Sequence, residues 1–381
     1  MSSTNSSTNA RPMTGVFPTV LAFLALLLLL VPPDARATQY TFVTIADGTG
    51  LLEVPEAASI SKHGRVAFWA SLDDGRLGIF SGEGGALTTI AVTGAGLTDI
   101  AIQHPGINKG GTVSFIGITP AGRAVLTGSG GPVTVLYDTT GPFADFAGYV
   151  SINDKGTVAF YGLLDNGSWC ICTGTGGATT TIVTAGNSNL GAFPAINEKG
   201  EVSFTAGNIG GVNGIFKGSG GRLVTVADET GGQHDFGAAT AINDHGEVAF
   251  FGFLDGGWET GIFVGNGRVP NAVTTVANTL GAFWRTEVSA INKRGVVAFF
   301  AELDTGLTPG GGQRAHGIFL GPDPVHDKVI GSGDLLFGKV VKGVSMGWGA
   351  LNDEGQIALS VVFTDETRTI VRADPVGKKP R

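Results

Sequence analysis

Asn243-Asp244-His245-Gly246-Glu247-Val248-Ala249-Phe250 is one copy of a motif that recurs along the chain. The shared pattern is Asn-x-x-Gly-x-(Val/Ile)-(Ala/Ser)-(Phe/Leu), and its copies begin at Ser61, Asn108, Asn153, Asn197, Asn243, Asn292 and Asn352. Successive copies start 44 to 60 residues apart. Self-similarity at such a period indicates a repeat architecture.

Each repeat is long enough for four short strands. In the fifth copy we predict strands at residues 238–242, 247–253, around 261–263 and 273–277. The Asn-x-x-Gly segment is a turn, because Asn bonds the backbone two residues on and Gly tolerates positive φ. A second turn contains Asp255 and two glycines.

The second strand of every copy carries a small residue beside a large one, for example Ala249 beside Phe250. Sheets that stack face to face need this alternation to interdigitate. Because both faces carry apolar residues, each sheet must be covered on two sides. This pattern predicts an all-β, seven-bladed β-propeller of four-stranded blades.

The two chain ends complement each other. The last repeat has no fourth strand, whereas residues 43–50 (VTIADGTG) match 224–231 (VTVADETG), a fourth strand. We therefore expect residues 43–46 to pair with 369–372, so that the N-terminal strand completes the last blade and closes the ring. An open solenoid or a two-sheet arrangement stays the alternative.

Composition excludes one class of partner. Formal net charge is −8, and the only cluster of basic residues is the short tail at 378–381. Nucleic-acid binding needs clustered Lys and Arg to neutralise phosphates, so we expect no nucleic-acid partner.

The first 37 residues resemble a signal peptide. Arg11 precedes an apolar run at 20–31, two prolines follow, and Ala35-Arg36-Ala37 is a small-x-small cleavage site. The run is shorter than the roughly 20 residues of a spanning helix, and an uncleaved anchor is the alternative. We predict residues 1–37 as signal peptide, 38–374 as the repeat domain and 375–381 as a basic tail. The mature protein is then secreted or otherwise extracytoplasmic, with no transmembrane segment.

Cys170 and Cys172 are the two cysteines of the chain. On an extended strand their Cα atoms would lie near or beyond the usual ~6.8 Å limit for a disulfide. We therefore expect two core-filling thiols, with a disulfide or a metal site as alternatives.

The motif resembles the NxxGxxAF tandem-repeat proteins, a group of exported bacterial proteins with variable C-terminal anchors. The resemblance covers residues 40–374. It implies export and a repeat fold, and it carries over no activity and no functional residue.

The turns between the second and third strands share one rim with the long loops that connect the repeats. That rim is the more varied, and function on rigid scaffolds usually lies on such loops. It carries Asp73, Asp165, Asp255, Glu259 and Asp304. These carboxylates could bind Ca²⁺ or a sugar, although Asp before Gly is ordinary hairpin chemistry.

Three non-repeating residues on the same rim are further candidates for ligand binding, namely Trp258, Trp284 and Arg285. Exposed aromatic side chains suit carbohydrate faces or a protein partner. We assign no catalytic residue, no metal ligand and no cofactor.

Two functions are compatible with these features. We favour an exported binding or scaffold protein with a carbohydrate, envelope or protein partner, because little in the chain departs from the repeat. The alternative is a secreted hydrolase of glycans or esters that uses carboxylates at the central funnel. Propellers host many unrelated functions, so the fold cannot decide between them.

Overall fold

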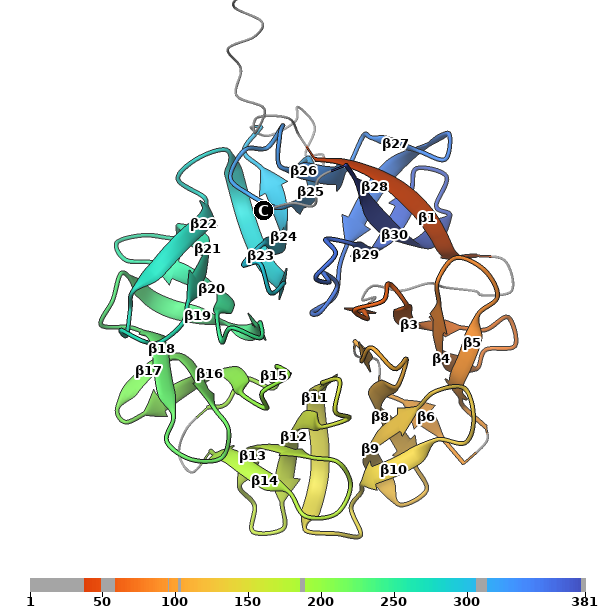
Figure 1. Cartoon of the computed structure of the whole chain (residues 1–381), viewed down its shortest axis with the longest axis vertical. Coiled ribbons are helices and arrows are strands. Elements are labelled where there is room, and N and C mark those ends of the chain that lie inside the picture. The colour runs from red at the N-terminus through yellow and green to blue at the C-terminus, as the bar shows by residue number, and fades with distance from the viewer. Residues whose placement is uncertain are drawn as a thin grey trace, which may run out of the picture. The chain divides into compact units, whose positions relative to one another are not determined.

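Seven antiparallel sheets surround a common centre, and each sheet forms one blade (Figure 1). The computed structural model describes residues 38–48, 59–94, 96–101, 104–185, 189–305 and 314–377. All regular elements within these ranges are strands. The predicted seven-bladed β-propeller is confirmed.

Blades are numbered in chain order, and the strand that leads into the motif turn is the innermost of each blade, which in blade 7 is β28. Blades 1 to 3 contain β2 (Ser59–Ile60), β3 (Val66–Ser71), β4 (Leu77–Gly82), β5 (Thr88–Val92); β6 (Asp99–Ile100), β7 (Gly106–Ile107), β8 (Val113–Thr119), β9 (Gly122–Gly128), β10 (Thr134–Tyr137); and β11 (Phe143–Ile152), β12 (Val158–Leu164), β13 (Trp169–Gly174), β14 (Thr180–Thr184). Blades 4 and 5 contain β15 (Ala195–Ile196), β16 (Val202–Ile209), β17 (Val212–Gly218), β18 (Val224–Asp228); and β19 (Gln233–Ile242), β20 (Val248–Leu254), β21 (Thr260–Gly265), β22 (Val273–Asn278). Blades 6 and 7 contain β23 (Phe283–Ile291), β24 (Val297–Leu303), β25 (His316–Phe319), β26 (Lys328–Gly331); and β27 (Leu335–Leu336), β28 (Lys339–Ser345), β29 (Ile357–Phe363), β30 (Arg368–Val376), β1 (Gln39–Asp47).

Part of the long spacing before the last repeat lies in the connection between β24 and β25, which spans 304–315, and part lies at the start of blade 7. A short extra strand, β27, forms a hairpin with the start of β28 before the blade begins. In addition, β30 continues to Val376, two residues past the end predicted for the repeat domain.

Ring closure follows the predicted register. β1 pairs with β30 antiparallel, with Val43 opposite Arg372 and Ala46 opposite Ile370. In Figure 1 the red N-terminal strand lies along the blue C-terminal sheet. The two chain ends therefore share one blade, and the last blade has no exposed third strand.

Neighbouring blades interlock through the small and large residues of their second strands. Ala159 of blade 3 packs in the same cluster as Phe204 of blade 4, and Ala249 of blade 5 packs with Phe299 of blade 6. All four residues are fully buried. The small residue of one blade thus packs against the large residue of the next, as the sequence pattern predicts.

The motif turns form a hydrogen-bonded belt around the axis, which we call the Asn belt. In Asn197, Oδ1 accepts the backbone N–H groups of Lys199 and Glu201, both at 3.0 Å. Its Nδ2 donates to the carbonyl of Asn243 in the next blade at 3.0 Å. Equivalent bonds to the next blade start at Asn108, Asn153, Asn243, Asn292 and Asn352. The motif glycines have φ between 76° and 84°, the region that favours Gly.

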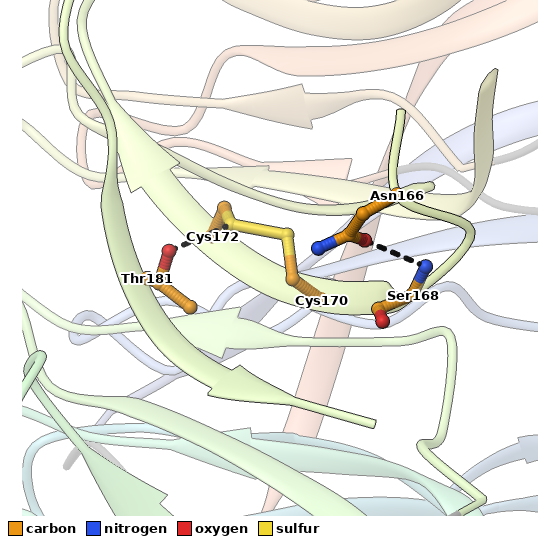
Figure 2. Close-up of a disulfide and its surroundings, with 5 residues drawn as sticks. All are labelled: Asn166, Ser168, Cys170, Cys172 and Thr181. Atoms are coloured by element: carbon orange, nitrogen blue, oxygen red, sulfur yellow. Dashed lines mark hydrogen bonds between the residues drawn. A yellow bond between two sulfur atoms is a disulfide. The ribbon is translucent and has the colours of Figure 1, made fainter. Parts of the chain in front are cut away.

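Cys170 and Cys172 form a disulfide across one face of β13 (Figure 2). The expectation of two free thiols is therefore wrong. Their Cα atoms are 5.8 Å apart, closer than assumed for an extended strand. The pairing of β13 with β14 shifts register between Ile171 and Cys172, as it does at the equivalent position of blades 1, 4, 5 and 6, so this part of the repeat is not a regular strand.

The disulfide occupies the space that a phenylalanine fills in other blades. Blades 1 and 5 carry Gly-x-Phe at the equivalent positions, and the Phe ring there lies over the glycine. A Cβ on Gly78 would come within 2.5 Å of the Phe80 ring. In blade 3 both members of this pair are cysteine, and both are fully buried.

Candidate functional site

The inner strands end around a central cavity of about 210 Å³, which we call the cup. Each blade contributes the end of its inner strand and the start of its motif turn. The cup therefore opens on the rim of the Asn-x-x-Gly turns. This is the rim opposite to the one that the sequence favoured for function.

Aromatic side chains close the inner end of the cup. Tyr149 of blade 3 donates its hydroxyl to the Trp348 carbonyl of blade 7 at 3.1 Å. The Trp348 ring centroid lies 4.2 Å from that of His104 and 4.5 Å from that of Phe193. Burial lowers the pKa of His104 to about 4, so this imidazole is neutral near pH 7.

Branched aliphatic residues form a collar above this floor. The residue before the motif Asn, or before Ser61, is isoleucine in six blades and Leu351 in blade 7. All seven line the cup, and they are Ile60, Ile107, Ile152, Ile196, Ile242, Ile291 and Leu351. The wall of the cup is thus apolar and shaped by one repeat position.

Charged residues form the mouth of the cup. The residue after the motif Asn, or after Ser61, supplies one charge per blade, and in ring order these are Lys62, Lys109, Asp154, Glu198, Asp244, Lys293 and Asp353. We call this set the charged rim. Blades 3 to 5 contribute only carboxylates, whereas three of the remaining four blades contribute lysine.

The lysines of the charged rim pair with neighbouring blades. Lys293 and Lys62 lie 3.2 Å and 3.9 Å from a carboxylate oxygen of Asp353, and Lys109 lies 3.7 Å from Asp154. Within the described ranges, Glu198 and Asp244 form no ion pair. The negative arc at blades 4 and 5 is therefore not neutralised.

Glu198 is held among other acceptors and acids. Its Oε1 accepts the backbone N–H of Asp154 at 2.8 Å, and its own N–H donates to Asp244. Partial burial raises the pKa of the Glu198 carboxyl, and the Asp154 and Asp244 charges raise it further. Ionised Glu198 thus opposes folding.

Glu198→Gln is expected to stabilise the protein at pH 7. The raised pKa means that wild-type stability falls as pH increases through the folded-state pKa. Glutamine removes that loss and keeps the acceptor for Asp154 N–H. Because the site is partly exposed, screening limits the gain to at most about 1 kcal/mol. The gain should vanish below about pH 4, where glutamate is protonated in both states. Urea unfolding across pH 3–8 measures this, and a gain independent of pH would contradict it.

The carboxylates predicted as ligand-binding lie apart from the cup. Asp73, Asp165, Asp255 and Asp304 sit in exposed turns of four different blades. Glu259 follows the turn in blade 5. In the described part of the chain, no group of three or more His, Cys, Asp or Glu is placed to hold a metal ion. The turns therefore present separate carboxylates.

The three non-repeating candidates divide between two blades. Trp258 is 91% exposed in blade 5 and lines neither cavity. Trp284 and Arg285 begin the inner strand of blade 6, where Trp284 is 56% exposed. Arg285 lines a second cavity of about 510 Å³ between blades 6 and 7.

Sequence reasoning missed the residues of the cup. The signal was present, because the residue four before the motif Asn is aromatic or His in four copies, His104, Tyr149, Phe193 and Trp348. The position after the Asn is charged in all seven copies. Both features recur with the repeat, so neither stands out as a departure from it.

No helix in the described ranges has the length and apolar character needed to cross a membrane.

Comparisons with known proteins identify the fold alone. No family model matches the chain, and no curated protein matches it. A solved oligogalacturonate lyase in complex with manganese is similar, with a TM-score of 0.56 and 11% identity over 90% of this chain and 98% of the lyase. A puromycin-hydrolyzing peptidase of Mycobacterium tuberculosis has a TM-score of 0.54 and 14% identity, over 91% of this chain and 56% of the peptidase.

Proposed function

We propose that this protein is an extracytoplasmic binding protein whose cup holds a short zwitterionic ligand with an apolar body, the size of an amino acid or a dipeptide. The observation that carries the proposal is the cup itself. It has an aromatic floor, an aliphatic collar and a mouth whose charges are divided between two arcs.

The division of charge determines how such a ligand would lie. In a ring of seven, blade 1 stands across from blades 4 and 5. Lys62 therefore faces the unpaired carboxylates Glu198 and Asp244 across the mouth. A ligand ammonium would bind at these carboxylates and a ligand carboxylate at Lys62, each as a charge-assisted hydrogen bond.

The apolar part of the ligand would enter the collar. Most small-molecule sites combine apolar walls with a few polar groups that fix orientation. Here the isoleucines and the faces of Tyr149 and Trp348 would take an aliphatic or aromatic side chain. Ligands without an apolar body would lose this contribution.

Two features support a location outside the cytoplasm. The first is the signal-peptide-like segment with its cleavage site at Ala37, which lies outside the described residues and supports export by its sequence. The Cys170–Cys172 disulfide lies within the described fold. Disulfides persist chiefly in oxidising compartments, which agrees with export.

Isothermal titration of the purified protein with Leu-Leu, its N-acetyl form and its C-terminal amide tests the proposal. We expect the free dipeptide to bind and each blocked form to bind at least about tenfold more weakly, which corresponds to about 1.4 kcal/mol. The double variant Glu198→Gln/Asp244→Asn and the variant Lys62→Met should lose affinity similarly. Lys199→Met changes a charge in the same turn outside the cup and should bind as wild type. Equal binding of the blocked forms, or no binding at millimolar dipeptide, would refute the proposal.

A second candidate is the hydrolase that uses carboxylates at the central funnel. The observation that favours it is the raised pKa of Glu198 beside two further carboxylates, a setting in which carboxyl groups act as proton donors. Analysis of the titrated dipeptide, and of chromogenic glycosides and esters, separates the two functions. Recovery of unchanged compounds supports binding, whereas cleavage that Glu198→Gln abolishes supports hydrolysis.

A further inference from the structure

Exposed apolar side chains gather on the rim opposite to the cup. On that rim, the described large hydrophobic residues with high exposure all belong to blades 5, 6 and 7 or the connections between them. They are Trp258, Leu280, Trp284, Leu335, Phe337 and Val340. Scattered apolar residues need no explanation, but a concentration on one side of a rim marks an interaction site.

A cleft lies at the centre of this arc, between blades 6 and 7, with a volume of about 510 Å³. Its wall in blade 6 is formed by β23, β24 and the start of β25. Its wall in blade 7 is formed by β28, β29 and the start of β30, and Gly343 of β28 faces His316. A Cβ on Gly343 would lie 3.3 Å from His316 Nε2, so the lack of a side chain there keeps the cleft open.

Trp284 does not line this cleft itself, but one face of its ring is covered by Arg314, which does. The Arg314 guanidinium lies 3.9 Å from the Trp284 ring centroid. Arg314 is itself held by an ion pair to Asp304 at 3.2 Å. The indole is therefore fixed by a stacked cation while more than half of the side chain stays exposed.

The cleft beside Trp284 is lined by planar polar groups. Arg285 pairs with Glu287 and lies 3.6 Å from Glu302. Arg314 and His316 line the same cavity. These side chains offer both donors and acceptors, and ion pairs join Arg285 to Glu287 and to Glu302.

We infer that the blade 6–7 cleft is a glycan-binding site. A pyranose ring would stack its C–H face on the free face of Trp284, as sugars do on exposed aromatic rings. Its hydroxyl groups would bond Arg285 and Glu302, which together provide a donor and an acceptor. A protein partner would instead require a more apolar surface, with charged groups at the periphery of the interface rather than at its centre.

This site is independent of the cup, because the two lie on opposite rims and share no lining residue. A glycan held by blades 6 and 7 would leave the mouth of the cup free. The protein would then attach to a polysaccharide surface through one rim and bind its small ligand through the other.

Binding of the purified protein to neutral, amino-sugar and uronic-acid oligosaccharides of four to six units tests this inference. We expect at least one class to bind, and Trp284→Ala to weaken binding at least tenfold while Trp284→Phe keeps part of it. Val325→Ala removes an exposed apolar side chain from the rim on which the cup opens. This variant should bind oligosaccharide as wild type does. Millimolar Leu-Leu should not compete with the oligosaccharide, whether or not the dipeptide binds in the cup.

Circular dichroism and thermal unfolding of Trp284→Ala should match those of wild type, because the side chain is exposed. The inference is overturned if no oligosaccharide binds the wild-type protein at millimolar concentration. It is also overturned if folded Trp284→Ala binds as tightly as wild type.

Discussion

Deletion of residues 38–47 is expected to unfold or aggregate the protein, although it removes no residue of the cup or the cleft. The segment supplies β1, which pairs with β30 and packs into the core through Ile45 and Ala46, 3% and 6% exposed. Tyr40, Phe42 and Val43 pack against the same core. Burial of such side chains contributes about 1.5–3 kcal/mol each, a large share of the ~5–15 kcal/mol of a typical domain. Size-exclusion chromatography and thermal unfolding measure the effect.

Point variants make the same prediction testable if the deletion does not yield soluble protein. Ile45→Ala should lower the free energy of unfolding by about 2–4 kcal/mol, because it leaves a cavity in the core of blade 7. Thr44→Ala is the control, since Thr44 is exposed on the same strand and surface changes usually stay within about 0.5 kcal/mol. If both variants unfold like wild type, the N-terminal strand does not close the ring.

Ring closure was predictable because its signal is local at both ends. The last repeat ends one strand short, and residues 43–50 carry the sequence of a fourth strand. Pairing of the two ends is favoured because β30 without a partner would be an exposed sheet edge. The strands of the fifth copy were predicted for the same reason. There the Asn-x-x-Gly turn and the alternation of Ala249 and Phe250 are signals that lie within a few residues of the strands they predict.

The cup was not predictable in the same way, because it depends on distance from the axis. Nothing in the pattern around Glu198 says that it approaches six equivalent residues from other blades. That convergence follows from the number and tilt of the blades. Regularity also hid the site, because charges that recur at one repeat position resemble ordinary solvated turns.

The cysteines and the blade 6–7 cleft show a second limit. The estimate for Cys170 and Cys172 assumed a regular strand, whereas this position of the repeat carries a register shift in five blades and the two Cα atoms lie 5.8 Å apart. The cleft depends on Gly343, where a missing side chain leaves space beside His316. Departures from regular strand geometry set these distances, and a pattern of residue types does not provide them.

Asn197→Ala is expected to cost about 2–4 kcal/mol of unfolding free energy, although it removes only one small polar side chain. Asn197 is 4% exposed. Its loss leaves the part-buried N–H groups of Lys199 and Glu201 and the buried carbonyl of Asn243 without this partner. Each buried polar group left unsatisfied costs about 1–3 kcal/mol. The loss would act both on the turn and on the contact between blades 4 and 5.

The chain itself supplies a control for separating these two effects. Blade 1 carries Ser61 in place of the motif Asn, and its Oγ accepts the Arg65 N–H at 3.1 Å. A serine thus holds the turn but is too short to bridge to the next blade. Asn197→Ser should therefore keep part of the turn and lose the bond to Asn243, with a cost of about 1–2 kcal/mol.

Urea unfolding of wild type, Asn197→Ser and Asn197→Ala should give three separate stabilities in that order. The intermediate value measures the inter-blade bond, and the step to alanine measures the turn. Equal stabilities for serine and wild type would mean that the belt adds nothing between blades. In that case the packing of Ala and Phe side chains alone would hold the ring together.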